Sequence, residues 1–126
     1  MTRAQLFDYV REQYGTEPDY PWQDDNAVLR HPSGKWYAVL LRVEPQRVGL
    51  IGTEPLDLLN VKCGPMLSGI AREKPGFLPA YHMNKLHWVS LRLDGTASEG
   101  DIREFLSISH ELTAPKAKKP RKEASE

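Results

Sequence analysis

The segment from residue 27 to residue 43 constrains the fold most strongly, because it predicts a β-hairpin. Strand-forming residues fill Ala27–His31 and Lys35–Val43, as expected for a pair of neighbouring strands. The connection between them, Pro32-Ser33-Gly34, places a glycine where a three-residue hairpin loop favours positive φ. We therefore expect an antiparallel sheet with this hairpin in it.

Further strands are predicted on the C-terminal side of this hairpin. Val48–Ile51 and Leu56–Val61 are short β-type segments. A second hairpin is expected over residues 80–93, because Val89–Leu93 alternates apolar and polar side chains. With Asn84-Lys85 as a two-residue turn, three cross-strand pairs would form: Met83 with Leu86, His82 with His87, and Tyr81 with Trp88.

Three amphipathic helices are predicted around these strands. Thr2 and Gln5 form a capping-box pattern before residues 3–14, and Gly15 ends that helix. Pro65 suits the first turn of a second helix, with an apolar face made by Met66, Leu67, Ile70 and Ala71. Ser98 with Asp101 caps a third helix, which is lined on one side by Ile102, Phe105, Leu106, Ser109 and Leu112.

The order of these elements predicts an α+β fold. A helix, about four strands, a helix, a hairpin and a helix suggest a two-layer α-β sandwich, with an antiparallel sheet and helices on one face. The length of 126 residues fits one domain, expected over residues 1–113. Residues 114–126 contain no large apolar side chain and are predicted to be a basic, disordered tail.

Composition and charge narrow the functional classes. The chain has 40% hydrophobic and 27% charged residues, no apolar run of about 20 residues and no signal-peptide pattern. The lone Cys63 suits a reducing cytoplasm. Residues 1–115 hold 12 Lys and Arg against 15 Asp and Glu, so the body is acidic. A domain dedicated to phosphate binding is usually basic, and here only the tail is.

The most informative cluster lies in Ala80–Trp88, which holds two of the four histidines. Paired across a ladder, His82 and His87 would lie within about 5 Å of each other. They could be hydrogen-bonded at the edge of the core, or they could recognise a ligand or polymer. They could also begin a metal site, which would need further ligands such as Cys63 and Asp94.

Catalytic chemistry finds little support in the sequence. Ser90, Ser107, Ser109 and Cys63 have no recognisable histidine and acid partner, and there is no glycine pattern that would cradle a phosphate. We therefore expect no enzyme activity, no cofactor and no metal.

Four blocks of sequence resemble the signature of the MmcQ/YjbR family. They are Tyr20-Pro21-Trp22, Gly34-Lys35-Trp36-Tyr37-Ala38, Asn60-Val61-Lys62-Cys63-Gly64-Pro65 and Pro79-Ala80-Tyr81-His82-Met83-Asn84-Lys85-Leu86-His87-Trp88. The resemblance covers residues 1 to about 113. It implies a CyaY-like fold, similar to frataxin, and DNA binding through two β-hairpin wings in transcription regulation.

Mapped onto this chain, the two wings are the hairpins around Pro32-Ser33-Gly34 and Asn84-Lys85. The expected contacts with double-stranded DNA come from Arg30, Lys35, Lys62, His82, Lys85 and Trp88. The alternative is a non-enzymatic module that binds a protein partner or a small ligand through the Tyr81–Trp88 surface. Salt-sensitive affinity would favour DNA.

Overall fold

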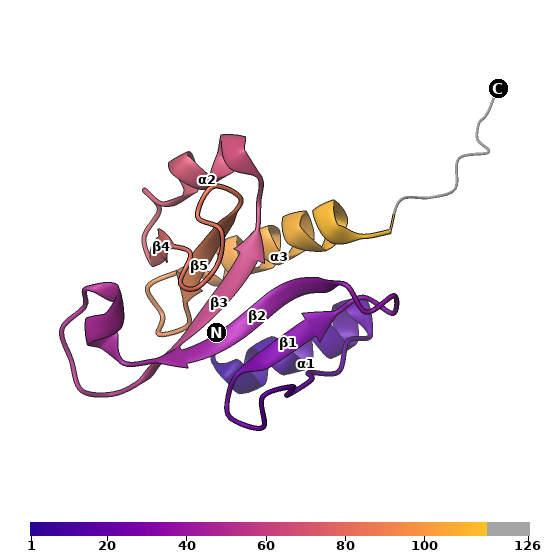
Figure 1. Ribbon diagram of the computed structural model, residues 1–126, viewed down its shortest axis with the longest axis horizontal. Coiled ribbons are helices and arrows are strands. Elements are labelled where there is room, and N and C mark those ends of the chain that lie inside the picture. Colours follow the sequence, from indigo (N-terminus) through magenta and orange to yellow (C-terminus); the bar gives the residue numbers. More distant parts are fainter. Residues whose placement is uncertain (116–126) are drawn as a thin grey trace.

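The computed structural model describes residues 1–115 and contains a five-stranded antiparallel sheet. The strands lie in the order β1-β2-β3-β5-β4 (Figure 1). In chain order the elements are α1 (Arg3–Tyr14), β1 (Ala27–Arg30), β2 (Trp36–Val43), the 3-10 helix η1 (Pro45–Val48), β3 (Leu56–Lys62), α2 (Pro65–Ala71), β4 (Phe77–Pro79), β5 (Trp88–Arg92) and α3 (Glu99–Thr113).

One face of the sheet packs against the helices and forms the core. Leu6 and Val10 of α1 and Ile102 and Leu106 of α3 are fully buried in it, because each pair recurs at helical spacing on one side of its helix. α1 and α3 lie behind the sheet in Figure 1. The sheet contributes alternate residues, among them Leu29, Ala38, Leu40, Leu59, Val61, Val89 and Leu91. The predicted α+β sandwich with helices on one face is therefore confirmed.

The first hairpin forms as predicted. The strands β1 and β2 pair antiparallel, and the His31 N–H donates to the Lys35 carbonyl at 2.8 Å. Gly34 has φ of 96°, which a glycine adopts without steric cost. An irregularity at Leu29/Arg30 leaves Tyr37 as an extra residue on β2. Tyr37 turns into the core, where its hydroxyl donates to Thr16 Oγ1 at 2.7 Å.

The prediction of a strand at Val48–Ile51 is wrong. The chain instead forms η1, which begins at Pro45 and ends before Gly49, whose φ is 75°. Proline supplies the fixed φ of a first helical turn and lacks the N–H that a ladder needs. Glycine then reverses the chain. Ile51 is fully exposed rather than paired in a sheet.

The second hairpin exists, but its predicted register is wrong. Phe77 pairs with Leu91, and Pro79 pairs with Val89, so residues 80–87 form a loop and His82 does not face His87. The ladder ends at the Pro79–Val89 pair, and inside the loop the side-chain oxygen of Asn84 accepts the Leu86 N–H at 2.8 Å. Asparagine favours such local turns because its side chain bonds to the backbone two residues ahead.

The predicted helix caps agree with the structure better than the predicted apolar faces do. The capping box of Thr2 and Gln5 and the left-handed Gly15 after α1 are present, and Ser98 caps α3. The predicted apolar face of α2 is right for Leu67 and Ala71, which pack against the core. It is wrong for Met66 and Ile70, which are 90% and 69% exposed.

The most buried residues of α2 are Ser68 and Ala71. Ser68 Oγ donates to the Leu86 carbonyl at 2.7 Å, which turns the Ser68 side of the helix toward the 80–87 loop. On α3, Thr113 is buried while Leu112 is 52% exposed, so Leu112 does not share the buried side.

In the part of the chain that the structure describes, no helix combines the length and hydrophobicity needed to span a bilayer. The predicted basic tail lies outside the described residues from residue 116 onward.

Candidate ligand-binding face of the sheet

No described helix covers the second face of the sheet, which we call the open face. Its central row is Val28, Val39, Asn60 and Ser90, which face one another across four strands. These side chains are nevertheless buried. The 80–87 loop folds back over this row from the β4–β5 edge, so the loop is part of the open face and not a projecting ribbon.

A ring of hydrogen bonds ties the 80–87 loop to the sheet. The Asn60 side-chain amide donates to the Tyr81 carbonyl at 2.8 Å, and the Tyr81 N–H donates to Ser90 Oγ at 3.0 Å. The Ser90 hydroxyl in turn donates to Asn60 Oδ1. Asn60 and Ser90 are fully buried, so each bond also satisfies a polar group that has no access to water.

The rest of the loop is held by α2 and by its own turn. Arg72 at the end of α2 donates to the Lys85 carbonyl. The Trp88 N–H donates to the Asn84 carbonyl at 2.9 Å. His82 has φ of 61° and its ring lies 3.9 Å from that of Tyr81, centre to centre. An unusual backbone conformation of this kind in a non-glycine residue is a feature of functional loops.

Beside the loop, the open face is hollowed into a trough that follows β2. An apolar hollow of about 340 Å³ is lined by Trp22, Asn26, Trp36, Val39, Leu41, His82 and Met83. A second hollow of about 380 Å³ shares Asn26, Leu41 and His82 with the first and extends to Arg47. The two hollows therefore adjoin at Asn26, Leu41 and His82. We call the pair the trough, which is apolar at the Trp22 end and polar at the Arg47 end.

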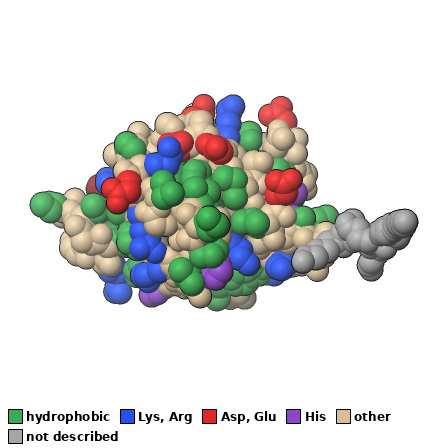
Figure 2. Space-filling model, turned by 90° about the horizontal axis from the view of Figure 1, so that it is seen from above, with side chains coloured by type: hydrophobic (Ala, Val, Ile, Leu, Met, Phe, Trp, Pro, Cys, Tyr) green, Lys and Arg blue, Asp and Glu red, His purple; other side chains and the backbone are tan. Residues whose placement is uncertain are grey.

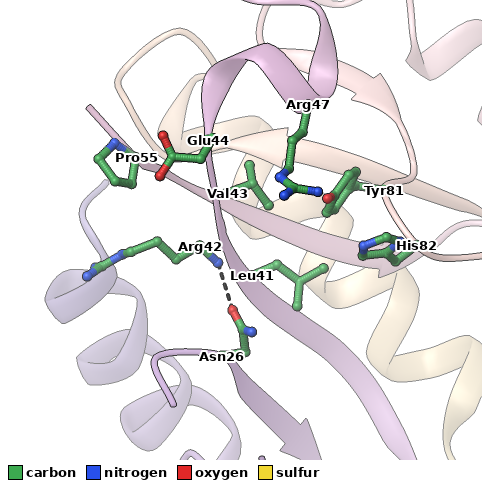
Figure 3. Close-up of a pocket in the computed structure, with 9 residues that line it drawn as sticks. All are labelled: Asn26, Leu41, Arg42, Val43, Glu44, Arg47, Pro55, Tyr81 and His82. Atoms are coloured by element: carbon green, nitrogen blue, oxygen red, sulfur yellow. Dashed lines mark hydrogen bonds between the residues drawn. The ribbon is translucent and has the colours of Figure 1, made fainter. Parts of the chain in front are cut away.

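Figure 3 shows the polar end of this trough. The side chains of Arg47 and Tyr81 point toward each other, with His82 beside them. The guanidinium of Arg42 points away from them, while its backbone N–H donates to the Asn26 side chain at 2.9 Å. Arg42 and Glu44 also line this end, and Arg47 is the cation whose side chain points toward Tyr81 and His82. A neighbouring hollow of about 400 Å³ adds Lys85.

Two tryptophans build the apolar end. The rings of Trp22 and Trp36 are perpendicular, with their centres 5.8 Å apart. The Arg30 guanidinium lies 5.6 Å from the centre of the Trp36 ring and donates to Asp19 Oδ2 at 2.7 Å. Trp36 is thereby held in place on both sides, while Trp22 remains 47% exposed.

Some Lys and Arg side chains of the described residues have no ion-pair partner. Within residues 1–115, seven of the 12 Lys and Arg side chains have a carboxylate within 4.0 Å. The five others lie in the β1–β2 turn, after β2, at the end of β3, after α2 and in the 80–87 loop: Lys35, Arg47, Lys62, Arg72 and Lys85.

The helical layer carries the opposite charge. α1 and α3 contain six acidic residues, Asp8, Glu12, Glu99, Asp101, Glu104 and Glu111, against three basic ones, Arg3, Arg11 and Arg103. Figure 2 shows Lys, Arg and His side chains along its lower edge and most Asp and Glu above them. The acidic excess of residues 1–115 therefore belongs to α1 and α3, because the described residues outside these helices hold nine basic and nine acidic side chains.

The residues predicted to contact DNA do not form one cluster. His82 and Lys85 lie together on the 80–87 loop and line the hollows. Arg30 is engaged by Asp19. Trp88 is half-buried at the start of β5 and does not line the apolar hollow.

The remaining two predicted cations sit at the β1–β2 end of the sheet. Lys35 is exposed in the β1–β2 turn. Lys62 is half-buried at the end of β3, where its N–H donates to Ser109 Oγ at 2.9 Å.

Sequence reasoning missed Arg47 and the structural role of Asn60. Arg47 directly precedes the strand predicted at Val48–Ile51. Its position two residues after Pro45, in a turn, is the only sequence feature that could have indicated an exposed cation. The sequence gives one indication of the role of Asn60, because it is a polar residue inside the largely apolar segment Leu56–Val61.

A second group of aromatic residues lies on the helical side, near the β1–β2 turn. His31 is buried and shares a hydrogen bond of 2.9 Å with Thr113 Oγ1. The ring centre of His110 lies 4.3 Å from that of His31 and 4.2 Å from that of Tyr14. Burial lowers the pKa of both histidines. The charge of His31 lowers the pKa of His110 further, and the charge of Lys35 does the same at His31. This cluster is structural, because its rings fill the space between α1, α3 and the hairpin.

Metal binding finds no geometric basis in the described part of the chain. Across residues 1–115, no three His, Cys, Asp or Glu side chains come together in a way that could hold an ion. The thiol of Cys63 is buried, and burial raises its pKa, which disfavours the thiolate that metals bind.

Comparisons with known proteins agree with this architecture. The YjbR family model matches residues 11–112, so the chain belongs to the YjbR family. Uncharacterized protein YyaQ of Bacillus subtilis is 44% identical over 116 residues, which cover 90% of this chain and 98% of YyaQ.

Solved structures show the same fold. A crystal structure of a Pseudomonas syringae protein has a TM-score of 0.87 at 40% identity and covers 90% of this chain and 100% of that one. A crystal structure of Deinococcus radiodurans protein DR2400, with the family-model domain DUF419, has a TM-score of 0.69 at 26% identity. It covers 94% of this chain and 82% of that one.

Proposed function

We propose that this protein binds DNA through the open face of its sheet. The observation that carries the proposal is the placement of charge. Arg47, Lys62 and Lys85 have no carboxylate partner within the described residues, while the excess of carboxylates lies on α1 and α3. Cations that no neighbouring acid neutralises are available to phosphate, and phosphate contacts supply most of the affinity of DNA-binding proteins.

The shape of the open face modifies the expected binding mode. The β1–β2 turn is a projecting hairpin tip that carries Lys35, as a wing requires. The 80–87 loop is held against the sheet by Asn60 and Ser90, so it contributes Lys85 and His82 as part of a surface. The proposed contact is therefore one wing beside a concave face, in place of two wings entering grooves.

A direct test measures binding of the full chain to a labelled DNA that contains a duplex half and a single-stranded half. Fluorescence anisotropy is recorded at several salt concentrations for the wild type and for a variant with Arg47→Gln, Lys62→Gln and Lys85→Gln. Each cation that contacts phosphate contributes about 1 to the slope of log affinity against log salt. The triple variant should therefore bind more weakly, with a slope reduced by about 3.

Two controls locate the binding surface. The matched variant Arg11→Gln with Arg103→Gln removes cations from the helical layer and should bind like the wild type. Changing the five basic residues after residue 115 to glutamine removes only the cations of the tail: Lys116, Lys118, Lys119, Arg121 and Lys122. If that change alone abolishes binding, the open face is not the DNA contact.

The second candidate function is a module for a protein partner or a small ligand. The apolar hollow between Trp22 and Met83 favours it, because ligand sites are concave and mostly apolar with a few polar groups at the rim. Affinity that does not depend on salt and survives the triple charge variant would support this candidate over DNA.

A further inference from the structure

We propose that the trough on the open face receives unstacked bases, so that the protein binds single-stranded DNA in preference to duplex DNA. This inference rests on the proposed function, because it specifies which form of DNA the open face recognises. It joins three features of the trough: an aromatic wall, a cationic end and a position below the surrounding surface.

The aromatic wall is available for stacking. Trp22 is 47% exposed, and its ring is held perpendicular to that of Trp36, so Trp22 has a defined orientation without being covered. Val39 and Leu41 of β2 and Met83 of the loop complete the apolar lining. Exposed aromatic rings beside an apolar floor are the platforms on which proteins stack bases of any sequence.

The cationic end of the trough lies where the phosphate backbone of a bound DNA single strand would pass. The trough follows β2 from Val39 to Val43, a span of about 13 Å at the usual rise per strand residue. Arg47 lines the far end together with Arg42 and Glu44, and the adjoining hollow, which Arg47 and His82 also line, adds Lys85. A DNA single strand with one base against Trp22 would therefore place its phosphates toward Arg47 and Lys85, as charge complementarity requires.

The recessed position favours a single strand over a duplex. A β-ribbon reads duplex DNA by entering a groove, which requires a projecting element. Here Tyr81 is bonded to Asn60 and Ser90 at the sheet surface, so the 80–87 loop forms a rim and does not project. Bases that are paired inside a duplex cannot enter a hollow below this rim, whereas bases of a single strand can.

The experiment compares labelled oligothymidine with a duplex of the same length, using the full chain in fluorescence-anisotropy titrations. We expect the single strand to bind about tenfold more tightly or better, because each stacked base adds affinity that a duplex cannot gain. Trp22→Ala should weaken single-strand binding by about tenfold. The matched control is Tyr20→Ala, since Tyr20 is similarly exposed in the same segment but does not line the trough.

Tryptophan fluorescence provides a second readout that does not depend on affinity alone. Oligothymidine should quench the emission of the wild type, and Trp22→Phe should lose most of that quenching while the protein stays folded by circular dichroism.

Three outcomes would overturn the inference. If duplex binds as tightly as the single strand and Trp22→Ala has no effect, the open face contacts DNA from outside the trough, and only the proposed function survives. If thymidine monophosphate binds as tightly as the oligonucleotide, the trough is a nucleotide site. If neither DNA form binds, the inference and the proposed function fail together.

Discussion

Asn60 at the centre of β3 and Tyr81 in the 80–87 loop are joined by a hydrogen bond of 2.8 Å from the buried side-chain amide to the backbone carbonyl. They are 21 positions apart in the sequence. Together with Ser90, this bond decides that the loop covers the sheet. The trough, with its rim and its apolar end, depends on that placement.

Asn60→Leu should therefore loosen the 80–87 loop. Leucine has a similar size but leaves the Tyr81 carbonyl and the Ser90 hydroxyl without their buried partner, which costs about 1–3 kcal/mol of unfolding free energy. Urea denaturation measures this cost, and hydrogen exchange at the Tyr81 amide reports the loop directly. Gln13→Leu on the exposed side of α1 is the control. Unchanged exchange at Tyr81 would show that the bond does not hold the loop.

Gly76→Ala should be more destabilising than Gly15→Ala. Both glycines have positive φ, 81° at Gly76 and 68° at Gly15, so alanine is strained at either position by about 1–2 kcal/mol. At Gly76, however, an added Cβ would lie 2.3 Å from the backbone nitrogen of Ala97, whereas at Gly15 nothing lies within 4 Å. Thermal unfolding of the two variants should show a clearly larger loss for Gly76→Ala. Equal losses would contradict the close packing of Gly76 against Ala97.

Acidification should destabilise the protein through His31 and His110. Burial lowers the pKa of both side chains below the ordinary value of 6.5. Below pH 6.5 the unfolded chain takes up protons that the folded chain excludes, so this contribution to stability is complete above pH 6.5 and is lost as the pH falls. Urea midpoints measured at intervals from neutral pH to about one unit below 6.5 should decrease accordingly.

The variant His110→Phe tests whether His110 causes this pH dependence of stability. Phenylalanine keeps an aromatic ring between Tyr14 and His31 but cannot take up a proton. The variant should therefore lose less stability than the wild type over the same pH interval. A slope identical to that of the wild type would exclude His110 as a source of the dependence.

Asp57 should contribute a separate effect at lower pH. Burial opposes its ionisation, but hydrogen bonds and charges from Arg3 and Arg42 outweigh burial, and the pKa lies below the ordinary 3.8. Its stabilising contribution is present above pH 3.8 and is lost as the pH falls through that value and below.

The corresponding variant is Asp57→Asn. It should lower the free energy of unfolding at neutral pH by about 1–2 kcal/mol, and it should flatten the pH dependence below pH 3.8. Asp8→Asn, whose side chain is 81% exposed, should do neither. An Asp57→Asn variant as stable as the wild type would mean that the two arginine contacts add nothing.

The sequence predicted the elements whose signals are local. Thr2 and Ser98 cap their helices as expected, and Pro32-Ser33-Gly34 closes the first hairpin, because each depends only on residues within a few positions. The face of α2 was only partly predicted. Ala71 is buried as expected, but Met66 and Ile70 are exposed, because a bond from Ser68 to Leu86 turns the Ser68 side of the helix inward.

The candidate site was only partly predictable. The block from Ala80 to Trp88 was recognised as the informative segment. Its hairpin register was wrong, because the ladder ends at Pro79–Val89 and the Tyr81 N–H then bonds to the Ser90 side chain. The trough arises where this loop meets Trp22 and β2 across the sheet. Such long-range contacts leave no periodic pattern in the sequence, and Arg47 therefore could not be assigned to the site.

The most direct test of the central claim is a backbone amide NMR titration of the full chain with unlabelled oligothymidine. The account predicts that the largest shift changes fall on the open face and its rim, at Trp22, Leu41, Lys62 and residues 81–85, and leave the exposed side of α1 and α3 unchanged. Shift changes confined to α1 and α3, or to residues after 115, would contradict a DNA-binding role for the open face.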